Sequence, residues 1–178
     1  MITAGVALVA LVVVGYLAGW LGAGGGGGGG VDGIDPVPGE RLRAEVVEVV
    51  DGDTINVAID GQAEPVRYIG LDTPEAAPGG AGPGSPGDEC FGPEATRYNA
   101  AMVAGSEVEL QIGAEPRDHY GRLLAYVRLG NLSVNAELLR AGYATALTIP
   151  PNDRRSGEFE RLEAAAQRAG IGLWAHCP

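Results

Sequence analysis

Alternation between apolar and polar residues predicts five β-strands in the part of the chain that follows position 40. In the segment Thr54–Ile59, for example, the side chains of Ile55, Val57 and Ile59 fall on one face, and Val and Ile are favoured in strands. Asp60 and Gly61 predict a hairpin turn after this segment. The five predicted strands are Arg43–Val50, Thr54–Ile59, Pro65–Leu71, Glu107–Ile112 and Arg122–Arg128.

Apolar residues at helical spacing predict three helices. The first begins at Pro93, because proline suits the first turn of a helix, and runs through Ala104. The second covers Asn131–Ala141 and is ended by Gly142. The third is marked by Phe159, Leu162, Ala166 and Ala169 and is closed by Gly170. The order of three strands, one helix, two strands and two helices predicts an α+β protein with an OB-fold five-stranded β-barrel and three helices.

The first 40 residues have a different character. Residues Ile2–Ala23 carry no charged side chain, and as a helix they would span roughly 33 Å, enough for the apolar layer of a bilayer. A cleaved signal peptide has a basic start and a small-residue cleavage site, which this segment lacks. We therefore expect residues 1–23 to be an uncleaved membrane anchor, with a cleaved signal segment as second choice, and the domain to be extracytoplasmic. Residues 24–40 predict a Gly-rich flexible linker, and residues 41–178 the folded domain.

Charge and composition exclude two classes of nucleic-acid-binding protein. The 178 residues include 12 basic ones, all of them Arg, against 23 acidic ones, for a net charge of −11. This balance excludes a polybasic nucleic-acid binder. Two Cys and two His, far apart in the chain, exclude a zinc finger. An enzyme that acts on nucleic acid is not excluded, because a few arginines can act locally.

Three short polar clusters contain residues suited to phosphodiester hydrolysis. They lie at Asp51–Thr54, Arg67–Glu75 and Asp118–Arg122. The first alone has a simpler interpretation as a polar turn and the third as a turn followed by a solvated charge, whereas the second is much less generic. Together they supply oxygen ligands for Ca²⁺ or Mg²⁺, guanidinium groups for a phosphoryl group, and a carboxylate that activates water. The candidates are Asp53 and Asp72 with a nearby backbone carbonyl for the metal, Arg67 and Arg122 for the phosphate, and Glu75 for the base.

These clusters belong to a longer, ordered set of motifs that resembles the staphylococcal-nuclease-like (thermonuclease) family. The motifs are VVDGDTI at Val49–Ile55, RYIGLDTPE at Arg67–Glu75, FGPEA at Phe91–Ala95, DHYGRLLAYV at Asp118–Val127, VNAELLRAGYA at Val134–Ala144 and GLW at Gly172–Trp174. Each motif alone is a weak signal, whereas the ordered set is highly specific. The resemblance extends over most of the chain beyond the linker.

The resemblance implies an OB-fold endonuclease that cleaves DNA and RNA with Ca²⁺ and leaves 3′-phosphate and 5′-hydroxyl ends. It assigns calcium ligands to Asp53, Asp72 and the carbonyl of Thr73, phosphate contacts to Arg67 and Arg122, the general base to Glu75, and a place lining the nucleotide site to Tyr120. DNA and RNA are then the expected partners, with no obligate protein partner. A membrane is a partner only if residues 2–23 stay uncleaved.

The chain departs from the best-known member of that family at two places near the expected nucleotide site. The loop Ala76–Asp88 has no basic residue where that member has a lysine-rich loop, and Leu147–Pro150 lacks two tyrosines that flank the nucleotide. Both changes are expected to weaken substrate binding more than chemistry. His119, His176 and Asp51 receive no role in the candidate site.

A non-catalytic OB-fold module that binds only nucleic acid or a protein is the alternative function. Such modules usually lack the catalytic arginines or the acidic pair. This chain has both of these pairs and Glu75 as well. A binding module would also carry more basic surface than a net charge of −11 allows. The sequence therefore favours the enzyme.

Cys90 and Cys177 are expected to form a disulfide. The count of cysteines is even, the N-terminal segment favours export to an oxidising compartment, and Cys177 lies where an untied C-terminus would fray. Two unrelated buried thiols are the alternative. Because neither cysteine belongs to the candidate site, reduction is expected to lower stability and to spare turnover.

Overall fold

The structure is a computed structural model that describes residues 34–77 and 85–178. The predicted anchor or signal segment 1–23 and most of the predicted linker 24–40 lie outside the described residues. Within the two described stretches, no helix has both the length and the apolar character needed to cross a bilayer.

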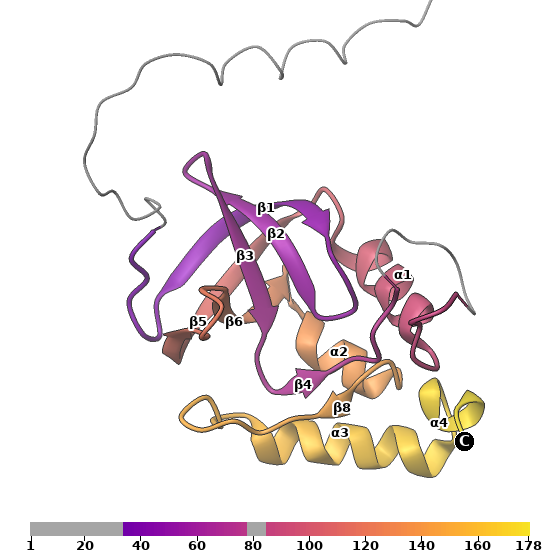
Figure 1. Cartoon of the computed structure of the whole chain (residues 1–178). Helices are drawn as coiled ribbons and strands as arrows, with labels where there is room; N and C mark the ends of the chain where they lie inside the picture. Colours follow the sequence, from indigo (N-terminus) through magenta and orange to yellow (C-terminus); the bar gives the residue numbers. More distant parts are fainter. Residues whose placement is uncertain (1–33, 78–84) are drawn as a thin grey trace, which may run out of the picture. The chain divides into compact units, whose positions relative to one another are not determined.

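Five strands form a closed barrel (Figure 1). They are β1 (Arg41–Val49), β2 (Thr54–Ile59), β3 (Gln62–Tyr68), β5 (Glu107–Arg117) and β6 (Leu123–Leu129). Antiparallel pairing runs in the order β3-β2-β1-β5-β6, and a parallel pairing of β3 with β6 closes the barrel. The short β7 (Leu132–Ser133) pairs with β6, while β4 (Leu71–Asp72) and β8 (Thr145–Ala146) form a separate two-stranded sheet. This closed barrel with helices fits the predicted OB-fold.

Alternate residues of the strands fill the barrel. Ile55, Val57 and Ile59 of β2 are between 0 and 4 % exposed, as the alternation predicts, and Val66 and Tyr68 of β3 are equally buried. Burying an apolar side chain of this size contributes roughly 1.5–3 kcal/mol. The core therefore fixes the register of β2 and β3, since a slip by one residue would turn the whole buried set toward solvent.

In the part of the chain that the structure describes, four helices accompany the barrel: α1 (Gly92–Val103), α2 (Val134–Arg140), α3 (Ser156–Ala169) and α4 (Leu173–His176). The first three correspond to the predicted helices, and α2 packs against β6 and contacts both α1 and α3 (Figure 1). The hydropathy pattern does not predict α4, because one helical turn is too short to show a repeat. Gly170 is the C-terminal cap of α3, as predicted.

Several element boundaries differ from the sequence prediction because backbone pairing sets them. The predicted strand Pro65–Leu71 is divided, since β3 ends at Tyr68 and Leu71 pairs with β8 as part of β4. The helix α2 begins at Val134 and not at Asn131, since the residues before it pair with β6 and the Ser133 hydroxyl caps the helix start. The strand β5 continues past Ile112 to Arg117, with an irregular register between these two residues. The extension of β5 matters for function, because it carries the chain directly into the Asp118–Arg122 cluster.

Cys90 and Cys177 form the predicted disulfide. The bond joins the segment before α1 to the residue that follows α4, across a sequence separation of 87. The residues next to the two cysteines also contact each other: Phe91, which follows Cys90, stacks on His176, which precedes Cys177, with 5.3 Å between ring centroids. The disulfide therefore fixes the C-terminus to the start of α1.

Removing this disulfide should lower stability. On the chain-entropy model, a bridge across 87 residues contributes roughly 4–5 kcal/mol to the free energy of unfolding. Denaturant unfolding of the oxidised protein and of a Cys90→Ser/Cys177→Ser variant measures the difference. Thiol titration under denaturing, non-reducing conditions is the control, and two free thiols per chain in the oxidised protein would rule out the bond.

Candidate active site

The tight turn between β1 and β2 carries the first predicted metal ligand. The carboxylate of Asp51 accepts a hydrogen bond from the N–H of Asp53 at 2.9 Å, which is a common way for aspartate to stabilise a turn. A Cβ on Gly52 would lie 2.5 Å from Oγ1 of Thr73, so a side chain there would prevent the contact. Glycine thus allows the turn to pack against Thr73, which brings Asp53 to the segment after β4.

Asp53 is a buried carboxylate with a side chain only 2 % exposed. Its Oδ1 accepts hydrogen bonds from the Thr54 hydroxyl at 3.1 Å and from Nη1 of Arg67 at 2.7 Å. Its Oδ2 accepts one from the N–H of Thr73 at 3.1 Å. Burial raises the pKa of Asp53 to about 7, although the charge of Arg67 acts in the opposite direction. An additional positive charge beside Asp53 would stabilise its ionised form.

Arg67 connects the two aspartates predicted as metal ligands. Its guanidinium pairs with Asp53 through Nη1 and with Asp72, on β4, through Nη2. Burial acts to lower the pKa of Arg67, but Asp53 and Asp72 outweigh it, and the pKa is raised above its ordinary value. Because Val66 and Tyr68 face the core on either side of it in β3, Arg67 projects away from the barrel interior.

The charges around Arg67 suit a hard divalent cation. Asp53 interacts electrostatically with Asp51 and Asp72, and Glu75 interacts with the same two carboxylates and with Arg67. Partial burial and, after it, the charge of Asp51 raise the pKa of Glu75. Asp53 and Asp72 thus pair with the guanidinium, and Asp51 and Glu75 interact with it electrostatically. Carboxylate oxygens are ligands that suit Ca²⁺.

Asp53, Asp72 and the carbonyl of Thr73 form the candidate ligand set. The three residues lie together, since Thr73 follows Asp72 in the chain and donates its N–H to Asp53. Among residues 34–77 and 85–178, no three His, Cys, Asp or Glu side chains form a metal-binding group by themselves. The candidate set is therefore two carboxylates and one carbonyl, and a cation held by it would fill its other positions with water or substrate oxygens.

The second arginine, Arg122, is held by the turn that follows β5. Asp118 accepts hydrogen bonds from the N–H groups of Tyr120 at 2.9 Å and Arg122 at 3.0 Å, and from Nε of Arg122 at 2.7 Å. Although partial burial acts against its charge, these bonds from Arg122 lower the pKa of Asp118 below its ordinary value. The guanidinium carbon of Arg122 lies 5.5 Å from the centre of the Tyr120 ring, which is 74 % exposed. The turn therefore presents a cation and an aromatic face together.

Two residues that the sequence analysis did not single out hold this turn in place. Glu64 on β3 and Arg117 at the end of β5 form a bidentate ion pair with N···O distances of 2.9 and 3.0 Å, and the Glu64 side chain is 4 % exposed. Arg117 also donates to the carbonyl of Gly121 at 2.7 Å. Removing one partner of a buried pair is strongly destabilising. The signal in the sequence is that Glu64 occupies an inward-facing position of the β3 alternation.

Asn99 is a further residue that sequence reasoning missed. It lies on α1, is 0 % exposed, and donates to the carbonyl of Asp51 at 3.0 Å. Its Oδ1 accepts a hydrogen bond from the hydroxyl of Tyr68 at 3.0 Å. Asn99 therefore fastens the metal-ligand turn to β3 and α1. An Asn among the apolar residues of a predicted helix is too common to indicate such a role.

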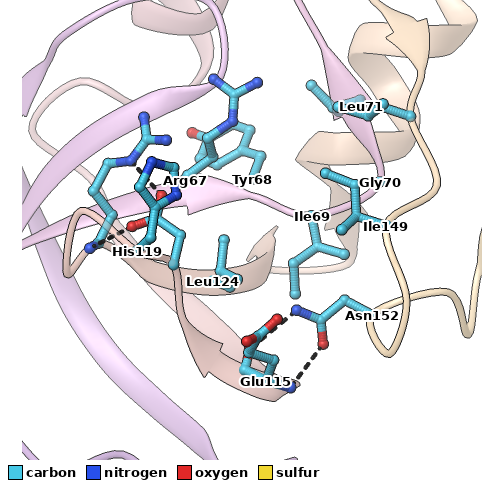
Figure 2. A pocket seen from close by; sticks show the side chains of 13 residues that line it. Arg67, Tyr68, Ile69, Gly70, Leu71, Glu115, His119, Leu124, Ile149 and Asn152 are labelled. Atoms are coloured by element: carbon cyan, nitrogen blue, oxygen red, sulfur yellow. Dashed lines mark hydrogen bonds and ion pairs between the residues drawn. The ribbon is translucent and has the colours of Figure 1, made fainter.

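Arg67 and Arg122 both line a pocket of about 330 Å³. Figure 2 shows Arg67 and His119 on one side of this pocket and Ile149 and Asn152 on the other. Its apolar wall includes Ile69, Leu71, Leu124, Leu147 and Ile149. Leu147 and Ile149 come from the segment that lacks the two tyrosines expected from the family. The pocket thus pairs two guanidinium groups with an aliphatic surface, which suits a phosphate joined to a flat apolar group.

The structure therefore gathers most of the predicted site residues into two groups. Asp53, Arg67, Asp72, Thr73 and Glu75 form one group at the ends of β3 and β4, and Arg122 with Tyr120 forms the other. The two groups meet at the pocket through their arginines. Cys90 and Cys177 belong to neither group.

Comparison with known proteins finds nucleases as relatives of this chain. The family model for the staphylococcal nuclease homologue matches residues 65–176. The chain is 39 % identical over 129 residues to a thermonuclease of Staphylococcus intermedius, which covers 72 % of this chain and 74 % of that protein. It is 34 % identical over 132 residues to a thermonuclease of Staphylococcus hyicus, with 74 % and 75 % covered. Endonuclease YncB of Bacillus subtilis is 34 % identical over 131 residues, with 71 % and 58 % covered.

The raised pKa of Asp53 predicts how stability depends on pH when no metal is bound. A carboxyl group with a higher pKa in the folded than in the unfolded protein stabilises the fold at low pH, and this contribution is lost as the pH rises from 3.8 to about 7. In chelator, the free energy of unfolding of the parent chain should therefore fall relative to that of Asp53→Asn over this interval, by roughly 2–4 kcal/mol. Denaturant unfolding of both proteins at several pH values measures the change. A difference that stays constant across the interval would mean that Asp53 ionises normally.

Proposed function

The chain belongs to the staphylococcal nuclease homologue family, and on this basis we propose that it is a Ca²⁺-dependent endonuclease acting on DNA and RNA. The observation that carries the proposal is the ion-pair network of Arg67 with Asp53 and Asp72, beside Glu75, at a pocket that Arg122 also lines. This network supplies oxygen ligands, two phosphate-binding cations and one carboxylate base. Each of these groups has a function in phosphodiester hydrolysis.

In this proposal the two arginines bind the phosphoryl group. A phosphodiester under attack gains negative charge on its non-bridging oxygens, and guanidinium groups bind such oxygens in a bidentate manner. Arg67 and Arg122 approach the pocket from β3 and from the turn after β5, and each is oriented by a carboxylate partner. Ca²⁺ bound by Asp53, Asp72 and the carbonyl of Thr73 would polarise the phosphoryl group and neutralise part of its charge.

Glu75 accepts the proton of the attacking water in this proposal. The oxygen of that water forms a bond to phosphorus, and the bond from phosphorus to the 5′ oxygen breaks. The leaving oxygen takes up a proton from solvent, and Glu75 then releases its own proton to solvent. The products are a 3′-phosphate and a free 5′-hydroxyl. A pKa raised by partial burial and by Asp51 makes Glu75 a stronger base than an ordinary glutamate. Tyr120 supplies an exposed ring next to Arg122 on which a base can stack.

We also propose that the domain acts outside the cytoplasm, held by residues 1–23 or released after their cleavage. The support is the uncharged sequence Ile2–Ala23 followed by a Gly-rich linker. A disulfide between Cys90 and Cys177 is consistent with an oxidising compartment. Protease added to intact cells should digest the domain, and protection until lysis would refute this topology.

The proposed activity depends on Ca²⁺, Arg122 and Glu75. The full chain should digest plasmid DNA and RNA in Ca²⁺ and lose activity in excess chelator. Arg122→Ala and Glu75→Gln should each lower kcat/KM about a hundredfold or more, since each removes roughly 3 kcal/mol of transition-state stabilisation. Arg67→Lys should be similarly impaired, because an ammonium cannot pair with two partners in one plane. Arg67→Ala is a poorer test, because it leaves Asp53 buried without its cation.

Arg43→Ala is the matched control for the arginine variants. Its side chain on β1 is 83 % exposed and pairs with Glu107 on the surface, so its loss should leave kcat/KM unchanged. Nucleic-acid binding by the parent without hydrolysis would instead support the binding-only OB-fold module. Full activity of Glu75→Gln would remove that residue from the role of base.

A further inference from the structure

The backbone around the proposed base is held by one neighbouring residue, Glu89. The N–H of Glu89 donates to the carbonyl of Glu75 at 2.9 Å, and the N–H of Glu75 donates to Oε2 of Glu89 at 3.1 Å. Both polar groups of the Glu75 main chain are therefore bound by a single residue. One step further along, the N–H of Ala77 donates to Oδ1 of Asp88 at 2.6 Å. Residues 75–77 are thus hydrogen-bonded to residues 88–89.

The start of α1 presses against the same carbonyl. A Cβ on Gly92 would lie 2.0 Å from the carbonyl oxygen of Glu75, which is far inside the van der Waals distance. The N–H of Gly92 donates to the carbonyl of Glu89 at 3.0 Å. Glu89 is therefore held at the helix start, and Glu75 lies in contact with both residues. The main chain of Glu75 therefore cannot shift without breaking its hydrogen bonds to Glu89.

The disulfide fixes the segment that carries Glu89. Cys90 directly follows Glu89 and is bonded to Cys177. Cys177 in turn donates its N–H to the carbonyl of Leu173 at 2.8 Å, and Leu173 donates to the carbonyl of Gly142 at 2.8 Å, after α2. The chain of contacts from Glu75 therefore passes through Glu89 and the disulfide to the C-terminal helix and the end of α2.

We propose that Glu89 is a positioning residue for Glu75, and that the Cys90–Cys177 disulfide holds Glu89 in place for that purpose. The proposal rests on the proposed function, in which Glu75 is the base. Glu89 acts chiefly through the main chain of Glu75, although its charge also interacts with the Glu75 carboxyl group, and the proposal gives it no contact with substrate. The expectation that reduction spares turnover is thereby revised, because the disulfide is next in sequence to the residue that holds the base.

Two substitutions of Glu89 test whether its hydrogen bond to the N–H of Glu75 matters for activity. Glu89→Gln keeps a side-chain oxygen that accepts the N–H of Glu75, whereas Glu89→Ala removes it. In the full chain with Ca²⁺, Glu89→Ala should lower kcat about 10- to 100-fold, the effect of a small misplacement of a catalytic group. KM should stay unchanged, because Arg67 and Arg122 are untouched, and Glu89→Gln should restore most of kcat.

Glu94→Ala is the matched control. Glu94 lies in the first turn of α1 and pairs with Arg97 on the surface, so its loss removes a nearby glutamate without touching Glu75. Its kcat should equal that of the parent. Amide hydrogen exchange provides a readout besides activity: the amide of Glu75 should exchange faster in Glu89→Ala than in the parent, Glu89→Gln or Glu94→Ala.

The outcomes distinguish this proposal from the proposed function. A parent chain without nuclease activity would overturn the proposed function and this inference with it. A fully active Glu75→Gln would overturn the role of Glu75 as base, and with it this inference, but not the nuclease activity. An active parent with an inactive Glu75→Gln and a fully active Glu89→Ala would overturn the positioning role alone. A folded Cys90→Ser/Cys177→Ser variant should show a lowered kcat at unchanged KM. A kcat equal to that of the parent would overturn the part assigned to the disulfide.

Discussion

Burying the carboxylate of Asp53 requires hydrogen-bond donors from three parts of the chain: Thr54 on β2, Arg67 on β3 and the N–H of Thr73 after β4. Thr54 and Arg67 are direct partners in the β2–β3 pairing, so the register that fills the barrel core also delivers two of these donors. The third arrives because glycine at position 52 lets the turn pack on Thr73. The hydrogen bonds to the Asp53 carboxylate thus depend on the same packing that forms the barrel, so a change in the packing would also change the environment of this carboxylate.

Each proposed phosphate-binding arginine has a carboxylate partner, Arg67 with Asp53 and Asp72, and Arg122 with Asp118. These partners orient long side chains that would otherwise lose conformational freedom when substrate binds. The arrangement suits a chain with a net charge of −11, which cannot attract a polyanion through its overall field. In the proposed function, binding then depends on Arg67 and Arg122 at the pocket; because carboxylates offset much of their charge, a divalent cation would supply further positive charge for a polyanion.

The sequence predicts the barrel and three helices, and the structure brings together most of the residues assigned to the candidate site. Alternation specifies β2 and β3 because their buried faces are apolar, and the motif residues lie where these strands end. The supporting contacts were out of reach. Asn99 and Glu89 are ordinary polar residues in the sequence, and Glu64 shows only that it faces inward in the β3 alternation. The roles of Glu64, Asn99 and Glu89 arise from partners 53, 48 and 14 positions away. Pairing over such separations is set by topology, which a local pattern does not contain.

The central claim is that Asp53 and Asp72, on either side of Arg67, form a cation site that supports hydrolysis. Calorimetric titration of Ca²⁺ into the full chain tests it most directly, with Asp72→Asn beside the parent and Glu94→Ala as control. Asp72 is the better residue to change, because its side chain is 51 % exposed and its loss leaves Asp53 paired with Arg67. We expect one Ca²⁺ per chain in the parent and the control and much weaker binding in Asp72→Asn. Equal Ca²⁺ affinity in all three proteins would contradict it.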